Sequence, residues 1–137
     1  MPATHSISIR VRYSECDPMG VAHHSAYAPW FEMGRTELLR VSAADGMDYR
    51  QMEEQGIFMA VARLEIRYKR PARYDDVLEL RTTLTDVGHV KLEHSYELFR
   101  AADGVLLATG ETTLACLDRE GRPRELPASL RAAERLG

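Results

Sequence analysis

The chain has 137 residues, of which 45% are hydrophobic and 28% are charged, so we expect a single globular domain over residues 1–137 with a core of its own. Its net charge of -3 argues against a protein that binds DNA or RNA by broad phosphate neutralisation. Residues 1–15 lack the apolar core of a signal peptide, and no apolar run is long enough to span a bilayer, so we expect a cytoplasmic protein. The two cysteines lack metal-ligand spacing, which suits reduced thiols in that compartment.

The first predicted element is a half-buried strand over residues 5–13. Apolar and polar side chains alternate there, as they do in a strand with one face on a core. The predicted buried face carries Ile7, Ile9, Val11 and Tyr13.

A tight turn and a long helix come next in the chain. Asp17, Pro18 and Gly20 predict the turn, because Pro presets φ and Gly accepts φ values that other residues avoid. The helix should begin between His24 and Ala26, with Ser25 as its N-cap and Pro29 in its first turn. Apolar or small residues at steps of three and four form the predicted buried stripe: Tyr27, Trp30, Phe31, Gly34, Leu38 and Val41. The opposite side should carry Glu32, Arg35, Thr36, Glu37 and Arg40.

The second half of the chain predicts a short helix and four strands. Residues 47–55 form the short helix, which Gly56 stops. The strands cover residues 57–70, 77–87, 90–100 and 105–117, with turns at Gly88 and His89 and at Asp103 and Gly104, and Pro127 opens a C-terminal helix. Because strands joined by tight turns are antiparallel, the order predicts an α+β fold with a five-stranded antiparallel sheet wrapped around one long central helix. Gly34 either lets that helix approach the sheet closely or is a tolerated glycine on an exposed turn.

The start of the long helix is the predicted place for chemistry. Unpaired N–H groups there can polarise a carbonyl, and the turn folds Asp17 back towards them. A carboxylate opposite an electrophile suits acyl hydrolysis, as nucleophile or as the base that activates water. Asp before Pro is also an ordinary turn residue, so the local pattern leaves both interpretations of Asp17 open. For His24 the pattern leaves open whether the backbone N–H or the imidazole acts, and Tyr13 is either a core aromatic or a hydrogen-bonding partner.

Two segments resemble one known family over nearly the whole chain. The first holds Tyr13, Asp17, Gly20, Val21, His24, Tyr27, Trp30, Phe31, Glu32 and Arg35, and the second holds Tyr68, Arg70, Pro71, Ala72, Tyr74, Asp75 and Asp76. Both resemble the signature of the 4-hydroxybenzoyl-CoA thioesterase family, whose members have the hotdog fold. The resemblance implies that Asp17 is the catalytic carboxylate, that an amide near His24 points at the thioester carbonyl, and that His24 and Tyr13 assist as side chains in some members. It also implies a homodimer or homotetramer with the active site between subunits. Pro29, Cys16 and His23 depart from the usual pattern.

Further candidates would bind the substrate. A basic group is either a solvated strand face or a site for the phosphates of coenzyme A: Arg67, Lys69, Arg70, Arg73, His89 and Lys91. Gly20, Tyr27, Trp30 and Met59 are further predicted substrate contacts, although the aromatic residues and Met59 also suit a core. A Cys16 nucleophile and a metal site built on Cys16, Asp17, His23 and His24 are weaker hypotheses, and we expect neither a metal nor a cofactor apart from coenzyme A as part of the substrate.

These observations lead to the hypothesis of an acyl-CoA thioesterase that releases a free acid and coenzyme A. One alternative is a hotdog dehydratase or hydratase of 3-hydroxyacyl thioesters, and another is a non-catalytic acyl-CoA binding module. The sequence leaves open the acyl group, the choice between coenzyme A and an acyl carrier protein, and the nucleophile or base role of Asp17.

Overall fold

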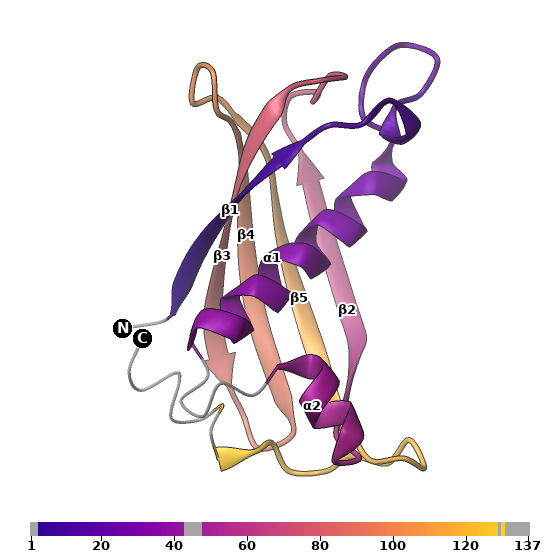
Figure 1. The fold of residues 1–137 in the computed structure, drawn as a ribbon, viewed down its shortest axis with the longest axis vertical. Helices are drawn as coiled ribbons and strands as arrows, with labels where there is room; N and C mark the ends of the chain where they lie inside the picture. The colour runs from indigo at the N-terminus through magenta and orange to yellow at the C-terminus, as the bar shows by residue number, and fades with distance from the viewer. Residues whose placement is uncertain (1–2, 43–47, 129, 131–137) are drawn as a thin grey trace.

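The computed structural model describes residues 3–42, 48–128 and 130 (Figure 1). Five strands form one antiparallel sheet in the order β1-β3-β4-β5-β2. Their bounds are β1 Thr4–Arg10, β2 Phe58–Tyr68, β3 Val77–Val87, β4 Lys91–Arg100 and β5 Leu106–Leu117. The sheet curves around α1 (Tyr27–Ser42), and α2 (Tyr49–Glu54) lies near the opposite end of the sheet from the start of α1. The predicted α+β hotdog architecture is confirmed.

The long helix packs on the sheet much as its spacing predicts. Tyr27, Trp30, Phe31, Gly34 and Leu38 are buried. At Gly34 the backbone meets β3 so closely that an added Cβ would lie 2.7 Å from Leu80 Cδ2 and closer still to Thr82 Oγ1. The close-approach interpretation of Gly34 is therefore the right one.

For two residues of α1, the prediction of which face is buried is wrong. Val41 is 63% exposed, because the helix has passed the edge of the core by its last turn. Arg35 is only 8% exposed, although the sequence pattern placed it among the polar residues. It stands four residues after Phe31 and three before Leu38, which puts it on the buried stripe.

Other element ends differ from their predicted positions. The first strand stops at Arg10, and Tyr13 begins a 3₁₀ turn (Tyr13–Glu15) where its side chain is 80% exposed rather than in a core. Asp48 caps α2 by accepting a hydrogen bond from the Gln51 N–H at 2.9 Å. The predicted C-terminal helix lies mostly outside the described residues, as does Met47.

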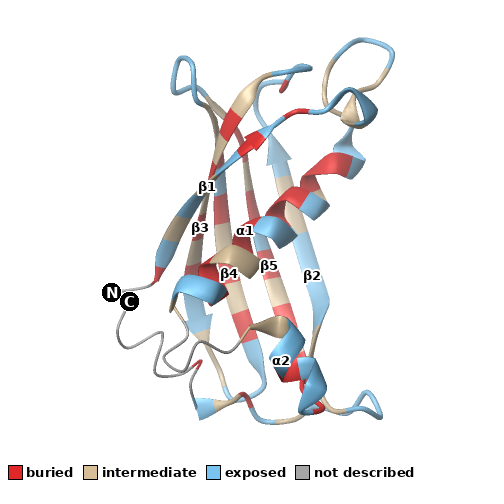
Figure 2. Cartoon of the chain, in the orientation of Figure 1, coloured by how far each residue is buried: buried red, intermediate tan, exposed pale blue. Residues whose placement is uncertain are grey.

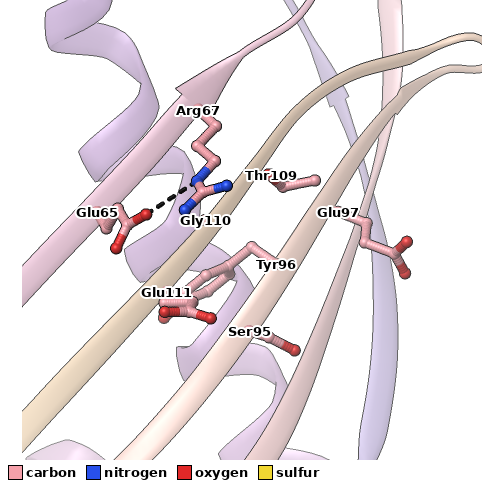
Figure 3. A pocket seen from close by; sticks show the side chains of 8 residues that line it. All are labelled: Glu65, Arg67, Ser95, Tyr96, Glu97, Thr109, Gly110 and Glu111. Carbon is pink, nitrogen blue, oxygen red and sulfur yellow. Dashed lines mark hydrogen bonds and ion pairs between the residues drawn. The ribbon is translucent and has the colours of Figure 1, made fainter.

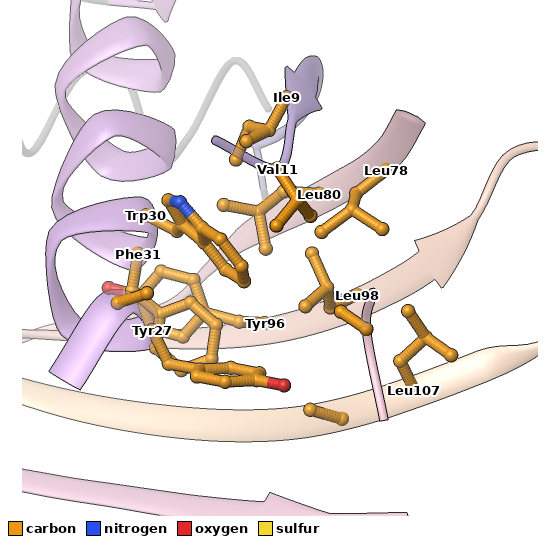
Figure 4. Close-up of a cluster of buried hydrophobic side chains, with 13 residues drawn as sticks. Ile9, Val11, Tyr27, Trp30, Phe31, Leu78, Leu80, Tyr96, Leu98 and Leu107 are labelled. Carbon is orange, nitrogen blue, oxygen red and sulfur yellow. The ribbon is translucent and has the colours of Figure 1, made fainter. Parts of the chain in front are cut away.

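The core has two clusters, one at each end of α1. The cluster at the start of α1 is rich in aromatic residues, and the Phe31 and Tyr96 rings stack with their centroids 4.3 Å apart (Figure 4). The other cluster joins Leu38, Leu39 and Met52 to the far ends of β3, β4 and β5. Figure 2 shows buried stretches along α1 where it lies against the sheet, while most of β2 is exposed. Within the described ranges, no helix is long and apolar enough to cross a membrane.

Candidate active site

The loop between β1 and α1 folds back on itself as a small antiparallel ladder. The Asp17 N–H donates to Val21 O at 2.9 Å, and the His23 N–H donates to Glu15 O at 2.7 Å. Asp17 is opposite Val21, so it lies three ladder positions, roughly 10 Å along the ladder, from the first helical residue, His24. The ladder thus leads from Asp17 directly into the helical segment.

The Asp17 carboxylate is oriented by the turn that it closes. Its Oδ1 accepts hydrogen bonds from the N–H groups of Met19 at 2.9 Å and Val21 at 3.4 Å. Gly20 has φ +77, with nothing within 4 Å of a Cβ added there, so it serves the turn. Its carbonyl accepts from the Tyr74 N–H at 3.3 Å. Within the described residues, Asp17 Oδ2 has no hydrogen bond, so one carboxylate oxygen is held and one is open.

The same turn occurs once more, at Asp118. There, Asp118 Oδ1 accepts from the N–H groups of Glu120 and Arg122, both at 2.9 Å, and Gly121 has φ +80. The hydrogen bonds of Asp17 are therefore those of an ordinary turn and do not by themselves indicate catalysis. Asp17 differs from Asp118 in its place in the fold, because the ladder of Asp17 leads into the helical segment that begins at His24.

That helix start presents backbone donors to its surroundings. A 3₁₀ turn (His24–Ala26) leads directly into α1, so the predicted start is confirmed, but the predicted Ser25 cap is wrong. His23 is the cap: its Nδ1 accepts from the Ser25 N–H at 3.1 Å. The His24 N–H has no acceptor within residues 3–42, 48–128 and 130. His24 is exposed, so its amide is the available donor at this helix start.

Glu15 connects the Asp17 loop to α1. Its carboxylate accepts from the Trp30 indole N–H at 2.9 Å and from the Arg12 N–H at 2.7 Å. Burial raises the pKa of the Glu15 carboxyl, but these hydrogen bonds outweigh it and hold the pKa below its ordinary value. The sequence pattern gave no sign of Glu15, whose partners lie 3 and 15 residues away.

The surface around the loop combines exposed aromatic and basic side chains. Tyr13 and Tyr74 pack edge to face with their centroids 5.6 Å apart. Lys69 and Arg70 come directly after β2, and Arg73 pairs with Val21 in an isolated bridge. All three cations are exposed, and none forms an ion pair within the described residues. They are therefore available for an anionic ligand beside the loop.

A groove of about 250 Å³ runs between α1 and β2. Its helix side is formed by Ala28, Pro29, Glu32 and Arg35, and its strand side by Val61 and Leu64. The start of α1 lies beside the end of β2, where the Tyr27 and Tyr68 rings meet at 4.9 Å. The groove therefore lies along the first turns of α1, from Ala28 to Arg35.

Comparison with known proteins identifies the family of the chain. The sequence profile of the thioesterase-like superfamily matches residues 11–133. The chain belongs to this superfamily. A Bacillus subtilis protein named as an acyl-CoA thioesterase, YneP, is 33% identical over 82% of this chain and 78% of its own length. The acyl-CoA thioester hydrolase YbgC of Escherichia coli is 30% identical over 89% of both chains. The solved structure of a DHNA-CoA thioesterase from Staphylococcus aureus has a TM-score of 0.86 and 30% identity, covering 95% of this chain and 87% of that one.

Several predicted site residues of this superfamily member lie away from the loop. His89 and Lys91 lie at the turn between β3 and β4, where Lys91 pairs with Ala115 near the end of β5. Lys69 follows Tyr68, which pairs with Ala108 near the start of β5. His89 Nδ1 instead lies 3.8 Å from Glu125 Oε1. The predicted basic group is therefore split between two ends of the sheet within one chain. The sequence alone could not predict whether these residues lie close together, because that depends on the strand register.

Three predicted substrate contacts are packed elsewhere. Tyr27 and Trp30 are 2% and 1% exposed, so both belong to the core of the single chain. Met59 pairs with Cys116 at the far end of β2, nine residues from Tyr68, or about 30 Å along the strand. A second groove, lined by Glu65, Arg67, Glu97 and Glu111 among others, lies on the sheet face away from α1 (Figure 3). No cluster of three or more metal-ligating side chains occurs among the described residues.

Proposed function

We propose that the protein is an acyl-CoA thioesterase that hydrolyses its substrate at the Asp17 loop. The His24 N–H polarises the thioester carbonyl, and the open oxygen of Asp17 attacks that carbonyl or activates the water that does so. Coenzyme A then leaves as a thiolate. The observation that carries this proposal is the pairing of an oriented carboxylate with an unoccupied amide at the start of the helical segment.

The basic residues beside the loop support coenzyme A as the carrier. Lys69, Arg70 and Arg73 are exposed and lack ion pairs within the described part of the chain. Charge-assisted hydrogen bonds from such side chains are the usual way to hold phosphate groups. They would anchor the nucleotide while the thioester reaches His24. Tyr13 stands exposed on the rim of the same loop, where its hydroxyl can reach a bound ligand.

The test is Asp17→Asn. An asparagine keeps the Oδ1 acceptor for Met19 and Val21, so the turn should stay folded while the carboxylate is lost. We expect kcat for thiol release from an acyl-CoA panel to fall at least about a hundredfold, the usual general-base contribution.

Asp118→Asn is the matched control, because it makes the same change in the same type of turn. It should leave kcat within about twofold, since surface changes away from a site have small effects. Full activity of Asp17→Asn in a folded protein would contradict the assignment of Asp17.

A further inference from the structure

The groove between α1 and β2 is lined by a nearly buried cation, Arg35. The Arg35 side chain is 9% exposed, and its carboxylate partner, Glu32, is 3.7 Å away and 70% exposed. The Tyr96 hydroxyl is a further neighbour of the guanidinium, but it also bonds Thr112 Oγ1 at 2.7 Å. A guanidinium has five N–H donors. Protein acceptors within the described residues therefore use only part of this donor set, and because Arg35 lines the groove, the remaining donors can meet acceptors that enter it.

A second buried group, beside Arg35, is unsatisfied. His94 is 4% exposed, and its Nδ1 has no hydrogen-bond partner among the described residues. Burial and the nearby Arg35 charge lower the pKa of His94 to about 3, so the imidazole is neutral and adds no second positive charge near Arg35. Arg35 is thus a fixed positive charge whose carboxylate partner in the groove, Glu32, is largely exposed to solvent.

We propose that Arg35 binds the distal end of the acyl group and selects acyl chains that carry an oxygen at that end. This inference rests on the proposed thioesterase function and names its substrate class. The Arg35 Cα lies about 12 Å beyond Tyr27 along the helix axis, and His24 lies about 6 Å before Tyr27 in the 3₁₀ turn. Its side chain leans back towards the helix start, which leaves room for a chain of roughly six carbons from a carbonyl at His24.

Two oxygen-containing groups, a hydroxyl and a carboxylate, can bind Arg35, and they differ in how they interact with Glu32. A hydroxyl accepts from Arg35 and donates to Glu32, so it uses both members of the pair. A carboxylate binds Arg35 in two places but is repelled by Glu32, which must turn towards solvent. Both supply acceptors for the remaining Arg35 donors, and a plain hydrocarbon chain supplies none.

The experiment compares kcat/KM for hexanoyl-CoA, 6-hydroxyhexanoyl-CoA and adipoyl-CoA by thiol release. We expect the wild-type protein to prefer at least one oxygenated chain by about tenfold or more, as for a charge-assisted hydrogen bond made in a desolvated site. Arg35→Met should bring that ratio close to one by lowering only the oxygenated rates. Glu32→Gln should reduce a preference for the hydroxyl chain and increase one for the carboxylate chain.

Arg40→Met is the matched control, since Arg40 lies on the same helix but outside the groove and pairs with Glu37. It should leave the preference unchanged. A wild-type ratio near one overturns the inference without any variant. A preference that survives in folded Arg35→Met overturns it too. If that variant keeps the preference but no longer forms the wild-type oligomer, Arg35 contributes to the contact with a second copy of the chain and not to substrate selection. Failure to release thiol from all three substrates would instead contradict the proposed hydrolysis.

Discussion

The Glu15 carboxylate is the contact that fixes the Asp17 loop against the helix. One side chain accepts hydrogen bonds from Trp30, inside the core, and from Arg12, at the end of the first strand segment. Its own carbonyl accepts from His23, the residue that caps the helical start. Asp17 is two residues away. Glu15 therefore holds the spacing between the proposed acid and the proposed amide.

Glu15→Gln tests this positioning role. A glutamine has one carbonyl oxygen in place of two carboxylate oxygens, and loss of a hydrogen bond to a charged group costs about 1.5–3 kcal/mol. We expect kcat to fall several-fold while KM changes less, because the carboxylate of Asp17 is displaced rather than removed. Trp30→Phe, which deletes the indole N–H, should act in the same direction, and the double variant should be less damaging than the sum of the two.

The control for Glu15 is Asp75→Asn, a change to an acid whose side chain is 61% exposed and bonds Arg10 at the surface. It should change neither kcat nor the free energy of unfolding by much. Strict additivity of the two kcat effects in the Glu15 and Trp30 double variant would mean that the two residues act separately.

Local signals explain which residues the sequence could identify. Asp17 and its turn were recognisable because Pro18 and Gly20 are adjacent in the chain. Arg35 was misplaced although the helical period puts it on the buried stripe, because a charged residue is seldom buried without a partner. Glu15 depended on Trp30, a contact that exists only once the loop has folded against the helix.

At the scale of elements, the contact between α1 and β3 depends on the absence of a side chain at Gly34. Gly34→Ala would place a methyl group against Thr82 and 2.7 Å from Leu80 Cδ2. Overpacking of this kind costs roughly 1–3 kcal/mol, more than the gain of up to about 1 kcal/mol from alanine's better helix propensity. We expect a lower free energy of unfolding by denaturant titration. Met33→Ala is the control: Met33 is 46% exposed on the same helix, so this change should alter the free energy of unfolding little. A Gly34→Ala variant more stable than the wild type would show that the helix can move away from β3 at little cost.

Strand positions were predictable where alternation and turns mark them, but register was not. The five strands match their predicted ranges within a few residues, and β2 to β5 are each flanked on both sides by a nearby Gly, Pro or Asp. The pairing of Lys91 with Ala115 and of Tyr68 with Ala108 joins residues far apart in sequence. For this reason the sequence grouped His89 and Lys91 with Lys69 and Arg70, which the fold separates.

At the scale of the whole molecule, β2 is an edge strand that exposes apolar side chains between charged ones. Val61, Leu64 and Tyr68 are 51%, 42% and 53% exposed, Arg63 and Arg67 form ion pairs with Glu65 on the same strand, and within the described residues β2 is hydrogen-bonded to β5 alone. An edge strand with exposed apolar side chains can pair with another chain. We propose that two copies join along β2, which would also close the groove beside Arg35.

Val61→Lys tests this dimer, because a lysine at an edge strand disfavours pairing. By light scattering after size exclusion we expect the wild type to be dimeric or larger and the variant to shift to monomer, with thiol release falling in parallel if the site needs both copies. Ser6→Lys makes the same change on β1, the opposite edge of the sheet, and should leave the mass unchanged. A wild-type monomer with full activity would show that one chain completes the site.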